Sequence, residues 1–449
     1  MTLPRSFVRP LVRPMVRSGA VGPYGGATYQ DGIHLNFASG NTTSGYYVKA
    51  VGAAPTVSPL TSLFTFTGGN QSMYMGPDGL LVASATNTPR IEYDATGNCL
   101  GLLMEAARTN LSLYSQSAGA AYTTVAEVTV TGNAGIAPDG TTTATLLTES
   151  TTAAAQHQWG QTPTWAATTT YTFSWFIKPN GRTWVQLRLS GAFGALCTAY
   201  FNLSGSGSVG TVSNFTTTSI QAYPNGWYRI RGTATSGAAP AGAIALIRLA
   251  NANGGETYTG DGVSGMYVWG HQVEAGAFPS SYIPTTTGSV ARTADSCSRT
   301  LGSEFSATAG TVVLAGRTSG GQDAGAGQTI IEFDDATSNE RHTITRAATS
   351  DTVRYNVFDG GVLQSSMDSA SLTNTTAFKS AWAWALNDIA QSTNGGVVNT
   401  DTGATLPTVT QLVLGGPGGN GNSFMNGHIL RFDYWPERKA NAFLVSAST

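Results

Sequence analysis

Two acidic residues in the C-terminal third of the chain, Glu332 and Asp334, have the type and spacing that glycoside hydrolysis requires. Side chains at positions i and i+2 of a β-strand point to the same face, so the two carboxylates would lie side by side. A retaining glycosidase uses such a pair as nucleophile and acid, about 5 Å apart. The next residues, from Asp335 to Asn339, have the composition of a turn. We therefore favour the end of a structural strand over a catalytic pair.

Motifs for nucleotide binding, zinc binding and nucleophilic catalysis are either incomplete or absent, or are followed by the wrong secondary structure. The stretch 205–210 matches G-x-G-x-x-G, but a strand-like Thr-Val-Ser-Asn sequence follows it. A dinucleotide site needs a helix there, so we expect a hairpin loop. The glycine-rich run 415–421 lacks the Lys-Ser/Thr of a phosphate loop, and the five histidines are scattered without a zinc motif. The sequence also contains no Gly-x-Ser-x-Gly nucleophile elbow.

Aromatic side chains beside polar stretches are candidates for carbohydrate binding, because sugar rings stack on aromatic faces. Trp159, Trp165 and Trp184 have such surroundings and are the candidate glycan contacts. Most tryptophans of β-sandwiches belong to the core. The alternating patterns around Trp175, Trp227 and Trp269 predict core positions for these three.

The composition predicts a β-rich chain of two or three domains. Charged residues make up 11% of the 449 residues, about half of the usual share, whereas there are 55 glycines. The net charge of −2 argues against a general nucleic-acid binder, and no apolar run approaches the roughly 20 residues of a membrane span. The cysteines Cys99, Cys197 and Cys297 are too far apart for a disulfide framework or a metal site, so we expect free thiols.

Residues 1–30 are predicted to form an extended arm. They carry four arginines and no acid, so the arm is +4 and the remainder of the chain −6. Pro10 and Pro14 exclude a helix, and the regular arginines argue against a secretory signal. We expect the arm to dock on another subunit, with a disordered terminus as the alternative. The expected docking residues are Arg5, Phe7, Arg9, Leu11, Arg13, Met15 and Arg17.

Strands with in–out alternation and turns between them predict an all-β fold. Residues 101–290 would form one antiparallel sandwich or jelly roll and residues 291–449 a second, because no helical crossovers separate the strands. Residues 31–100 would form a small β connector, and only the last dozen residues could form a helix. The first sandwich is expected from the alternating segments 171–177, 183–189, 226–231, 243–249 and 265–270. The second is expected from 310–315, 329–333, 353–358, 381–386, 411–414 and 427–434, with a hairpin turn at 359–361.

Several phrases of the sequence resemble structural proteins of tailed bacteriophages. The segment 101–115, Gly-Leu-Leu-Met-Glu-Ala-Ala-Arg-Thr-Asn-Leu-Ser-Leu-Tyr-Ser, is similar to one that opens a carbohydrate-binding-module-like jelly roll in such proteins. The likeness continues at 137–142, 258–262, 268–276 and 281–285. The unit after it resembles a concanavalin/laminin-G-type domain, closing at 426–436 and 441–444. These phrases recur in head fibres, tail fibres and spikes, so they indicate the class and not the place on the virion.

The resemblance has two consequences for chemistry. Glucanases of the concanavalin-like fold carry a third acid three residues beyond the Asp, and position 337 here is Thr. Jelly-roll modules often hold a structural Ca²⁺, for which Glu105, Asp261 and Glu274 could supply ligands. The alternative is that these carboxylates are solvated or paired with arginine, such as Arg108. No other cofactor is expected.

We therefore expect a non-enzymatic virion protein of a tailed phage, a fibre, spike or decoration. By analogy with the family it would be a homotrimer that docks on capsid or tail subunits through residues 1–30 and displays lectin-like domains to host-surface glycans. Neither nucleic-acid binding nor membrane insertion is expected. Two alternatives stay open, a glycan-degrading depolymerase that uses Glu332 and Asp334, and a secreted cellular adhesin.

Overall fold

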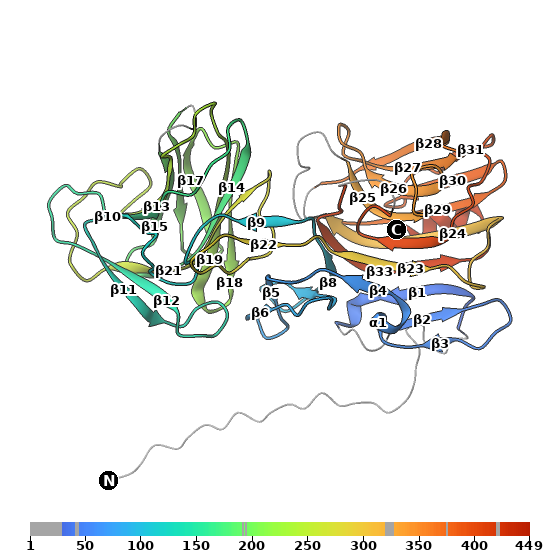
Figure 1. Ribbon diagram of the computed structural model, residues 1–449, viewed down its shortest axis with the longest axis horizontal. Coiled ribbons are helices and arrows are strands. Elements are labelled where there is room, and N and C mark those ends of the chain that lie inside the picture. Colours follow the sequence, from blue (N-terminus) through green and yellow to red (C-terminus); the bar gives the residue numbers. More distant parts are fainter. Residues whose placement is uncertain are drawn as a thin grey trace, which may run out of the picture.

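The computed structural model describes residues 29–40, 45–190, 193, 195–318, 327–373, 376–418 and 423–449. Nearly all regular structure in these residues is β-strand, arranged in antiparallel sheets, and it forms two sandwiches joined side by side (Figure 1). The predicted fold class, all-β with two antiparallel sandwiches, is confirmed. The arm residues 1–28 lie outside the described part of the chain.

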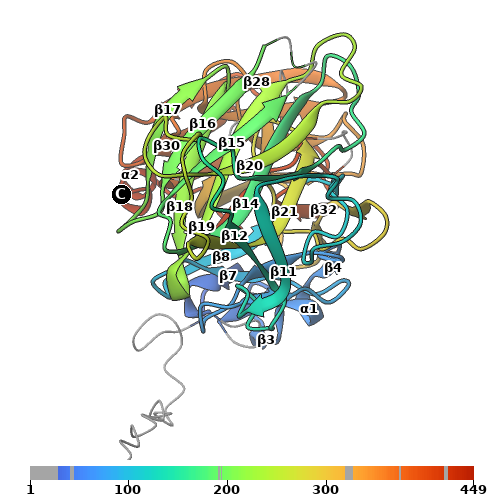
Figure 2. The ribbon, with the colours of Figure 1, turned by 90° about the vertical axis from the view of Figure 1, so that its left-hand side faces the viewer.

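The first sandwich consists of two six-stranded sheets. We call the sheet on the side away from the second sandwich the distal sheet and the other the proximal sheet (Figures 1 and 2). The distal sheet contains, in order, β10 (Thr124–Ala126), β13 (Gln158–Gln161), β20 (Ile244–Ala250), β15 (Trp184–Ser190), β16 (Cys197–Asn202) and β17 (Ser208–Ser213). The proximal sheet contains β11 (Val128–Gly135), β12 (Ala144–Glu149), β21 (Gly265–Ala275), β14 (Thr170–Asn180), β19 (Trp227–Thr235) and β18 (Thr217–Tyr223).

The second sandwich pairs a ten-stranded with a seven-stranded sheet. The larger sheet contains, in order, β3 (Thr56–Val57), β2 (Tyr46–Lys49), β1 (Gly32–Asn36), β33 (Gly427–Trp435), β24 (Ala309–Thr318), β29 (Ala377–Ala385), β30 (Asp388–Thr393) and β31 (Asn399–Asp401). In addition, β8 (Cys99–Met104) pairs with β33, and β7 (Ile91–Tyr93) pairs with β8. The smaller sheet contains, in order, β28 (Val362–Ser371), β27 (Thr352–Asp359), β26 (Arg341–Arg346), β25 (Gln328–Asp334), β32 (Gln411–Leu414), β23 (Ser296–Thr300) and β4 (Thr65–Thr67).

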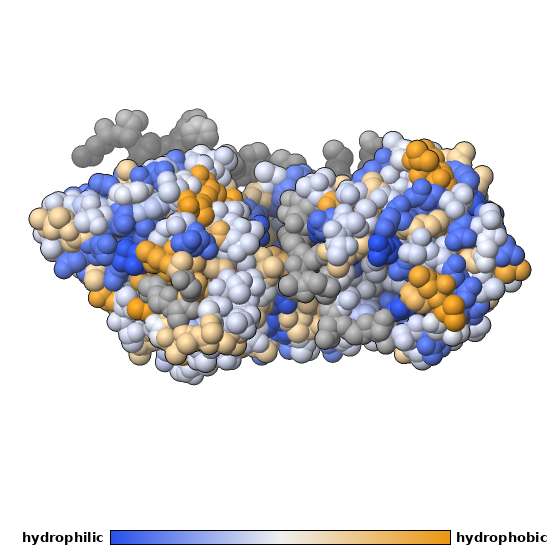
Figure 3. Space-filling view, turned by 90° about the horizontal axis from the view of Figure 1, so that it is seen from above, coloured by the Kyte–Doolittle hydropathy of each residue, from blue (hydrophilic) through white to orange (hydrophobic). Residues whose placement is uncertain are grey.

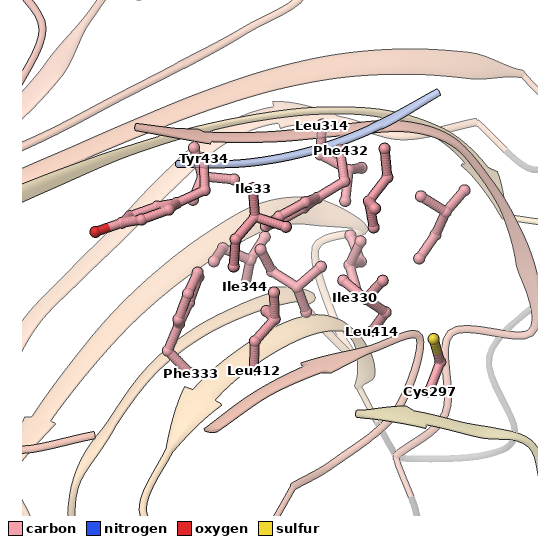
Figure 4. Close-up of a cluster of buried hydrophobic side chains, with 14 of the residues drawn as sticks. Ile33, Cys297, Leu314, Ile330, Phe333, Ile344, Leu412, Leu414, Phe432 and Tyr434 are labelled. Atoms are coloured by element: carbon pink, nitrogen blue, oxygen red, sulfur yellow. The ribbon is translucent and has the colours of Figure 1, made fainter. Parts of the chain in front are cut away.

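The N-terminal strands belong to the second sandwich. Residues 31–100, for which the composition predicts a separate connector, place β1 against β33 and β4 against β23. The side chains of β1 explain this pairing, because Ile33 and Leu35 are fully buried against apolar residues of the C-terminal strands. Figure 4 shows Ile33 among Leu314, Phe432, Ile344 and Leu412 in that core. The segment is therefore an integral part of a sandwich and not a spacer.

A two-stranded ribbon carries the chain between the sandwiches. β9 (Arg108–Asn110) leads into the first sandwich and pairs antiparallel with β22 (Val290–Arg292), which leads out of it (Figure 1). The first sandwich is thus an insertion between β8 and β23 of the second. A small hairpin, β5 (Met73–Met75) with β6 (Leu81–Ala83), packs against the outer face of the proximal sheet, where Trp227 and Trp269 are buried.

Short elements complete the fold. Helix α2 (Asn441–Ala447) confirms the predicted C-terminal helix, whereas α1 (Leu60–Leu63) and the 3-10 turns η1 (Phe37–Ser39) and η2 (Pro224–Gly226) were not expected. The turn after Asp359 has positive φ at both glycines, as a tight hairpin requires. The three cysteines are free thiols, as predicted. No helix within the described ranges is long and apolar enough to cross a bilayer.

Candidate functional site

A row of polar side chains crosses the outer face of the distal sheet. Gln158 on β13 lies opposite Arg248 on β20, Arg248 lies opposite Gln186 on β15, and Gln186 lies opposite Tyr200 on β16. Directly opposed residues of antiparallel strands project to the same face of a sheet. These four residues therefore form one line across four strands, which we call the polar row. Figure 2 shows β15, β16 and β20 across the end of the molecule that faces away from the second sandwich.

The alternation of β15 explains why this face is polar. Every second side chain of this strand is fully buried in the sandwich core, namely Val185, Leu187 and Leu189. The intervening residues Trp184, Gln186 and Arg188 must point to the opposite face, because side chains of a strand alternate. Two of them, Trp184 and Arg188, stay half-buried and flank Gln186, which is 2% exposed.

Hydrogen bonds link the polar row only in part. Gln186 Nε2 donates to the Tyr200 hydroxyl at 2.6 Å, that hydroxyl donates to the carboxylate of Glu256, and Arg248 Nε donates to Gln158 Oε1 at 2.9 Å. Four buried polar atoms on this face have no hydrogen-bond partner among the described residues: Arg188 Nε, Arg248 Nη1, Gln186 Oε1 and Asn202 Oδ1. Two are donors and two are acceptors. Buried polar atoms without partners also occur on the second sandwich, as at Glu332 and Asp334, so they do not by themselves mark a site.

The electrostatics of the face favour a polar or anionic ligand group. Burial, together with the positive charge of Arg188, lowers the pKa of Arg248 to about 10. Burial and the bond to the Glu256 carboxylate raise the pKa of Tyr200, so its hydroxyl stays protonated at neutral pH. The face therefore presents two guanidinium groups close enough to repel each other, and a lone pair or negative charge between them would relieve that repulsion.

Trp184 adds an aromatic surface beside the polar row. It lies opposite Asn202 on β16 and Ala250 on β20, so it occupies the neighbouring position along the strands. Its ring reaches across to β17, where a Cβ at Gly210 would lie 2.8 Å from the ring atom Cζ3. Glycine at 210 therefore leaves the space that the indole occupies. Trp184 is the one predicted glycan contact that the structure brings to this face.

The other two predicted tryptophan contacts are placed differently. Trp159 is 3% exposed and stacks on Tyr122 with ring centroids 3.7 Å apart, so its faces are not open to a sugar. Trp165 packs edge-on or tilted against Tyr171, Phe173 and Phe193, and its Nε1 donates to the Ala243 carbonyl at 2.8 Å. It also lines a hollow of about 630 Å³ beside the β9–β22 ribbon. Both rings support the core of the first sandwich.

The acidic pair Glu332 and Asp334 lies on one face of β25, as predicted, but it is closed to solvent. Glu332 is 1% exposed and Asp334 0%. The backbone of Gly418 stands directly over Asp334, since a Cβ there would lie 1.6 Å from Asp334 Oδ2. Asp334 Oδ1 accepts from Gln411 Nε2 and from the backbone N–H of Ala336, each at 2.6 Å. A polysaccharide has no path to these oxygens in this conformation.

The carboxylates considered for calcium have separate protein partners. Glu105 pairs with Arg90 at 2.8 Å, Asp261 accepts from the backbone of its own loop, and Glu274 accepts from Ser280 and lies 3.8 Å from Arg108. The described part of the chain contains no group of three or more His, Cys, Asp or Glu side chains arranged to hold a metal ion. The arginine-paired alternative for Glu274 is confirmed.

Sequence reasoning did not identify most of the polar row. Its four residues, Gln158, Gln186, Tyr200 and Arg248, lie on four strands separated by up to 90 residues, and only the register brings them together. One signal for this face was present in the sequence, because Trp184, Gln186 and Arg188 alternate with the apolar residues of the same strand. The predicted docking residues between Arg5 and Arg17 lie outside the described residues.

Comparisons with known proteins add no functional argument. No protein-family model matches the sequence, and no curated protein matches it. Among solved structures, the chain is similar to the Ruminococcus gnavus IT-sialidase CBM40 bound to α2,3-sialyllactose, with 15% identity and a TM-score of 0.28 over 32% of this chain and 83% of that one. A leech intramolecular trans-sialidase is 16% identical, with a TM-score of 0.27 over 32% of this chain and 23% of that one. A heptameric SAP-like pentraxin from Limulus polyphemus is 12% identical, with a TM-score of 0.24 over 32% of this chain and 73% of that one. TM-scores this low support no inference about this chain.

Proposed function

We propose that this chain binds carbohydrate through the polar row and Trp184, and that it acts by binding and not by catalysis. The observation that carries the proposal is the row of polar side chains across the outer face of the distal sheet, with the half-buried Trp184 and Arg188 beside it. Sugar hydroxyls both donate and accept hydrogen bonds, so they match a face that combines the guanidinium groups of Arg188 and Arg248 with side-chain amides. The adjacent indole of Trp184 can stack on a sugar ring.

The position of the face supports the same proposal. The distal sheet lies at the end of the molecule farthest from the second sandwich (Figure 2), where a large glycan would meet no other part of the described chain. On the face shown in Figure 3, apolar residues lie in small separate patches. The acidic pair of the second sandwich is closed, which favours binding over hydrolysis.

Substitutions on the distal sheet test the proposal. The purified chain would be screened on a glycan microarray and the best ligand measured by calorimetry. Trp184→Ala and Arg188→Gln are each expected to weaken binding about tenfold or more, because stacking and charged hydrogen bonds each contribute roughly 1–3 kcal/mol. Thermal unfolding should change little, since both side chains are half-buried on the outer face.

Two matched variants control this experiment. Arg354→Gln removes a similarly exposed arginine that pairs with Asp368 on the second sandwich, and binding should be unchanged. Trp165→Ala should lower the melting temperature, because its ring packs in the core, while leaving the affinity intact. Loss of binding in Trp165→Ala but not in Trp184→Ala would place the site at the hollow beside the ribbon and overturn the proposal.

The same proposal places the chain on the virion of a tailed phage as a fibre, spike or decoration protein, assembled as a homotrimer. Its support is the resemblance of segments 101–115 and 268–276 to phage structural proteins and the basic arm of residues 1–30. The arm would dock on capsid or tail subunits, with arginines bonding to acidic or carbonyl groups. The sandwiches would then face outward toward host glycans.

Deletion of residues 2–18 tests the docking role. The shortened protein should remain soluble and β-rich, because all described strands begin after residue 31. It should no longer be incorporated into particles, as measured by quantitative immunoblotting of purified virions. A charge-preserving variant with the four arginines changed to lysine controls for charge alone. Particles that carry the shortened protein at full occupancy would show that the arm does not dock it.

A further inference from the structure

A cavity of about 370 Å³ lies between the two sandwiches. One wall is the outer face of the proximal sheet, from β18 and β19. The other wall comes from β7, β8, β24 and β33 of the second sandwich. In Figure 1 β18 and β19 lie on the side of the first sandwich that faces β8. The cavity is distinct from the polar row, which lies on the opposite side of the first sandwich.

Two arginines stand on the first wall without an acidic partner. Arg229 and Arg231 lie two residues apart on β19, so both point into the cavity. Arg229 Nη2 donates to Ser174 Oγ at 3.0 Å and to the Ser280 carbonyl at 3.1 Å, while its buried Nε has no partner. Arg231 Nε donates to Ser219 Oγ. Neither arginine forms an ion pair with any described residue.

A third arginine faces them from the second wall. Arg317 on β24 lies opposite His428 on β33, and both line the cavity. Arg317 also forms no ion pair within the described ranges. Because it belongs to the other sandwich, guanidinium groups without an acidic partner among the described residues line the cavity from both units.

The acidic residues of the cavity are already engaged. Glu92 pairs with His428 at 2.7 Å, and Glu105 pairs with Arg90 at 2.8 Å and lies 3.5 Å from Arg292. Asp94 accepts hydrogen bonds from Thr96 and Asn98 within its own turn. Glu105 is neutralised by its own arginines, so the three cavity arginines outnumber the two remaining carboxylates, Glu92 and Asp94, and the net charge of the lining is positive. Burial together with the charge of Arg229 lowers the pKa of Arg231.

We propose that this cavity binds a small anionic ligand through a carboxylate, sulfate or phosphate group held by Arg229 and Arg231 from one sandwich and Arg317 from the other. Guanidinium groups match the planar or tetrahedral oxygens of such anions and bind them with charge-assisted hydrogen bonds. The cavity has the size of a single sugar or a comparable small molecule. A ligand held by both walls would also fix the two sandwiches relative to each other.

Calorimetry on the full chain at low ionic strength tests the proposal. The probes are inorganic phosphate, inorganic sulfate and D-glucuronate, with D-glucose as the uncharged counterpart of glucuronate. At least one anion should bind while glucose does not, and added NaCl should weaken the binding because salt screens charge. Tighter binding of glucuronate than of both inorganic ions would identify a carboxylate sugar as the ligand class, and the reverse order a phosphate or sulfate group.

Single substitutions locate the site. Arg231→Gln and Arg317→Gln should each weaken anion binding about tenfold or more, whereas Arg231→Lys should retain part of it because it keeps the charge. Arg354→Gln, which removes an arginine paired with Asp368 away from both sites, is the matched control and should leave anion binding unchanged. Loss of anion binding in Arg188→Gln would instead assign the anion to the distal sheet, so failure here and failure of the glycan site are distinguishable. Circular dichroism would verify that each variant is folded. The proposal would be overturned if no anion bound, or if Arg231→Gln and Arg317→Gln both bound the anion as tightly as the unchanged protein does.

Discussion

Glu332 lies on β25 with 1% of its surface exposed, and its Oε1 atom has no hydrogen-bond partner among the described residues. Burial, reinforced by the negative charge of Asp334, raises its pKa from 4.5 to about 7. Arg341, 3.9 Å away, offsets this only in part. A carboxyl group with a raised pKa binds its proton more tightly in the folded state than in the unfolded state. The folded protein is therefore penalised when this group ionises, and its stability falls as the pH rises from about 4.5 to 7.

Glu332→Gln should remove this pH dependence. A pKa raised from 4.5 to about 7 corresponds to roughly 3 kcal/mol of difference between the two protonation states. The free energy of unfolding of the variant, relative to the unchanged protein, should therefore increase by up to about 3 kcal/mol between pH 4.5 and pH 8. Urea denaturation at a series of pH values measures this difference. The comparison cancels any pH-independent cost of the amide or of the lost contact with Arg341.

Glu437→Gln is the control, because this carboxylate is 62% exposed and pairs only with Lys439 on the surface. The difference in free energy of unfolding between this variant and the unchanged protein should stay constant over the same pH range. The same Glu332 variant also separates binding from catalysis. If the unchanged chain released reducing sugar from a polysaccharide and Glu332→Gln abolished that release, the acid would be catalytic and the structural interpretation of the pair would be wrong.

At the scale of elements, a buried asparagine ties the start of the first sandwich to its end. Asn110 on β9 donates through its amide to the carbonyls of His271 at 3.1 Å and Ile283 at 2.8 Å. Its Oδ1 accepts from the backbone N–H groups of Ser112 and Val273, each at 3.0 Å. One buried side chain thus ties segment 101–115 to segment 268–285. These contacts give the two segments a structural role in packing.

Strands could be predicted from the sequence, but their partners could not. The segment 171–177 has buried residues on both faces of β14. The sandwich core lies on one side of the strand, and the β5–β6 hairpin together with Tyr282 lies on the other. Its β character was still evident from its aromatic and β-branched residues. The pairing of β1 with β33 joins residues about 400 positions apart, as His34 and Asp433 show. No local periodicity encodes that contact.

The candidate site was predictable in one strand only. The alternation of Trp184, Gln186 and Arg188 with apolar residues indicates a polar outer face on β15. The polar row itself depends on the register of β13, β20 and β16 with β15. If one of these strands were shifted by one residue, its side chains would turn to the other face of the sheet and the row would be broken. A single sequence contains no measure of that register. Trp159 was misjudged for the same reason, since it faces the core from β13.

At the scale of the whole molecule, the first sandwich is an insertion whose two ends lie side by side. Thr109 on β9 is paired with Ala291 on β22, so the chain enters and leaves through adjacent strands. The second sandwich is correspondingly discontinuous. It needs residues before the insertion, because Leu102 and Met104 on β8, as well as the apolar residues of β1, are buried in its core.

This topology predicts opposite outcomes for two shortened chains. Replacing residues 110–290 by Asn-Gly should close β9 and β22 as a two-residue hairpin and leave a folded second sandwich. Its melting temperature should be lower than that of the full chain, because Met73 and Met75 lose Trp227 and Trp269 as packing partners. The fragment 293–449 should be insoluble or unfolded, since without β1 and β8 its core is open to water. Circular dichroism with thermal melts measures both, and cooperative unfolding of 293–449 alone would show that the N-terminal strands are dispensable.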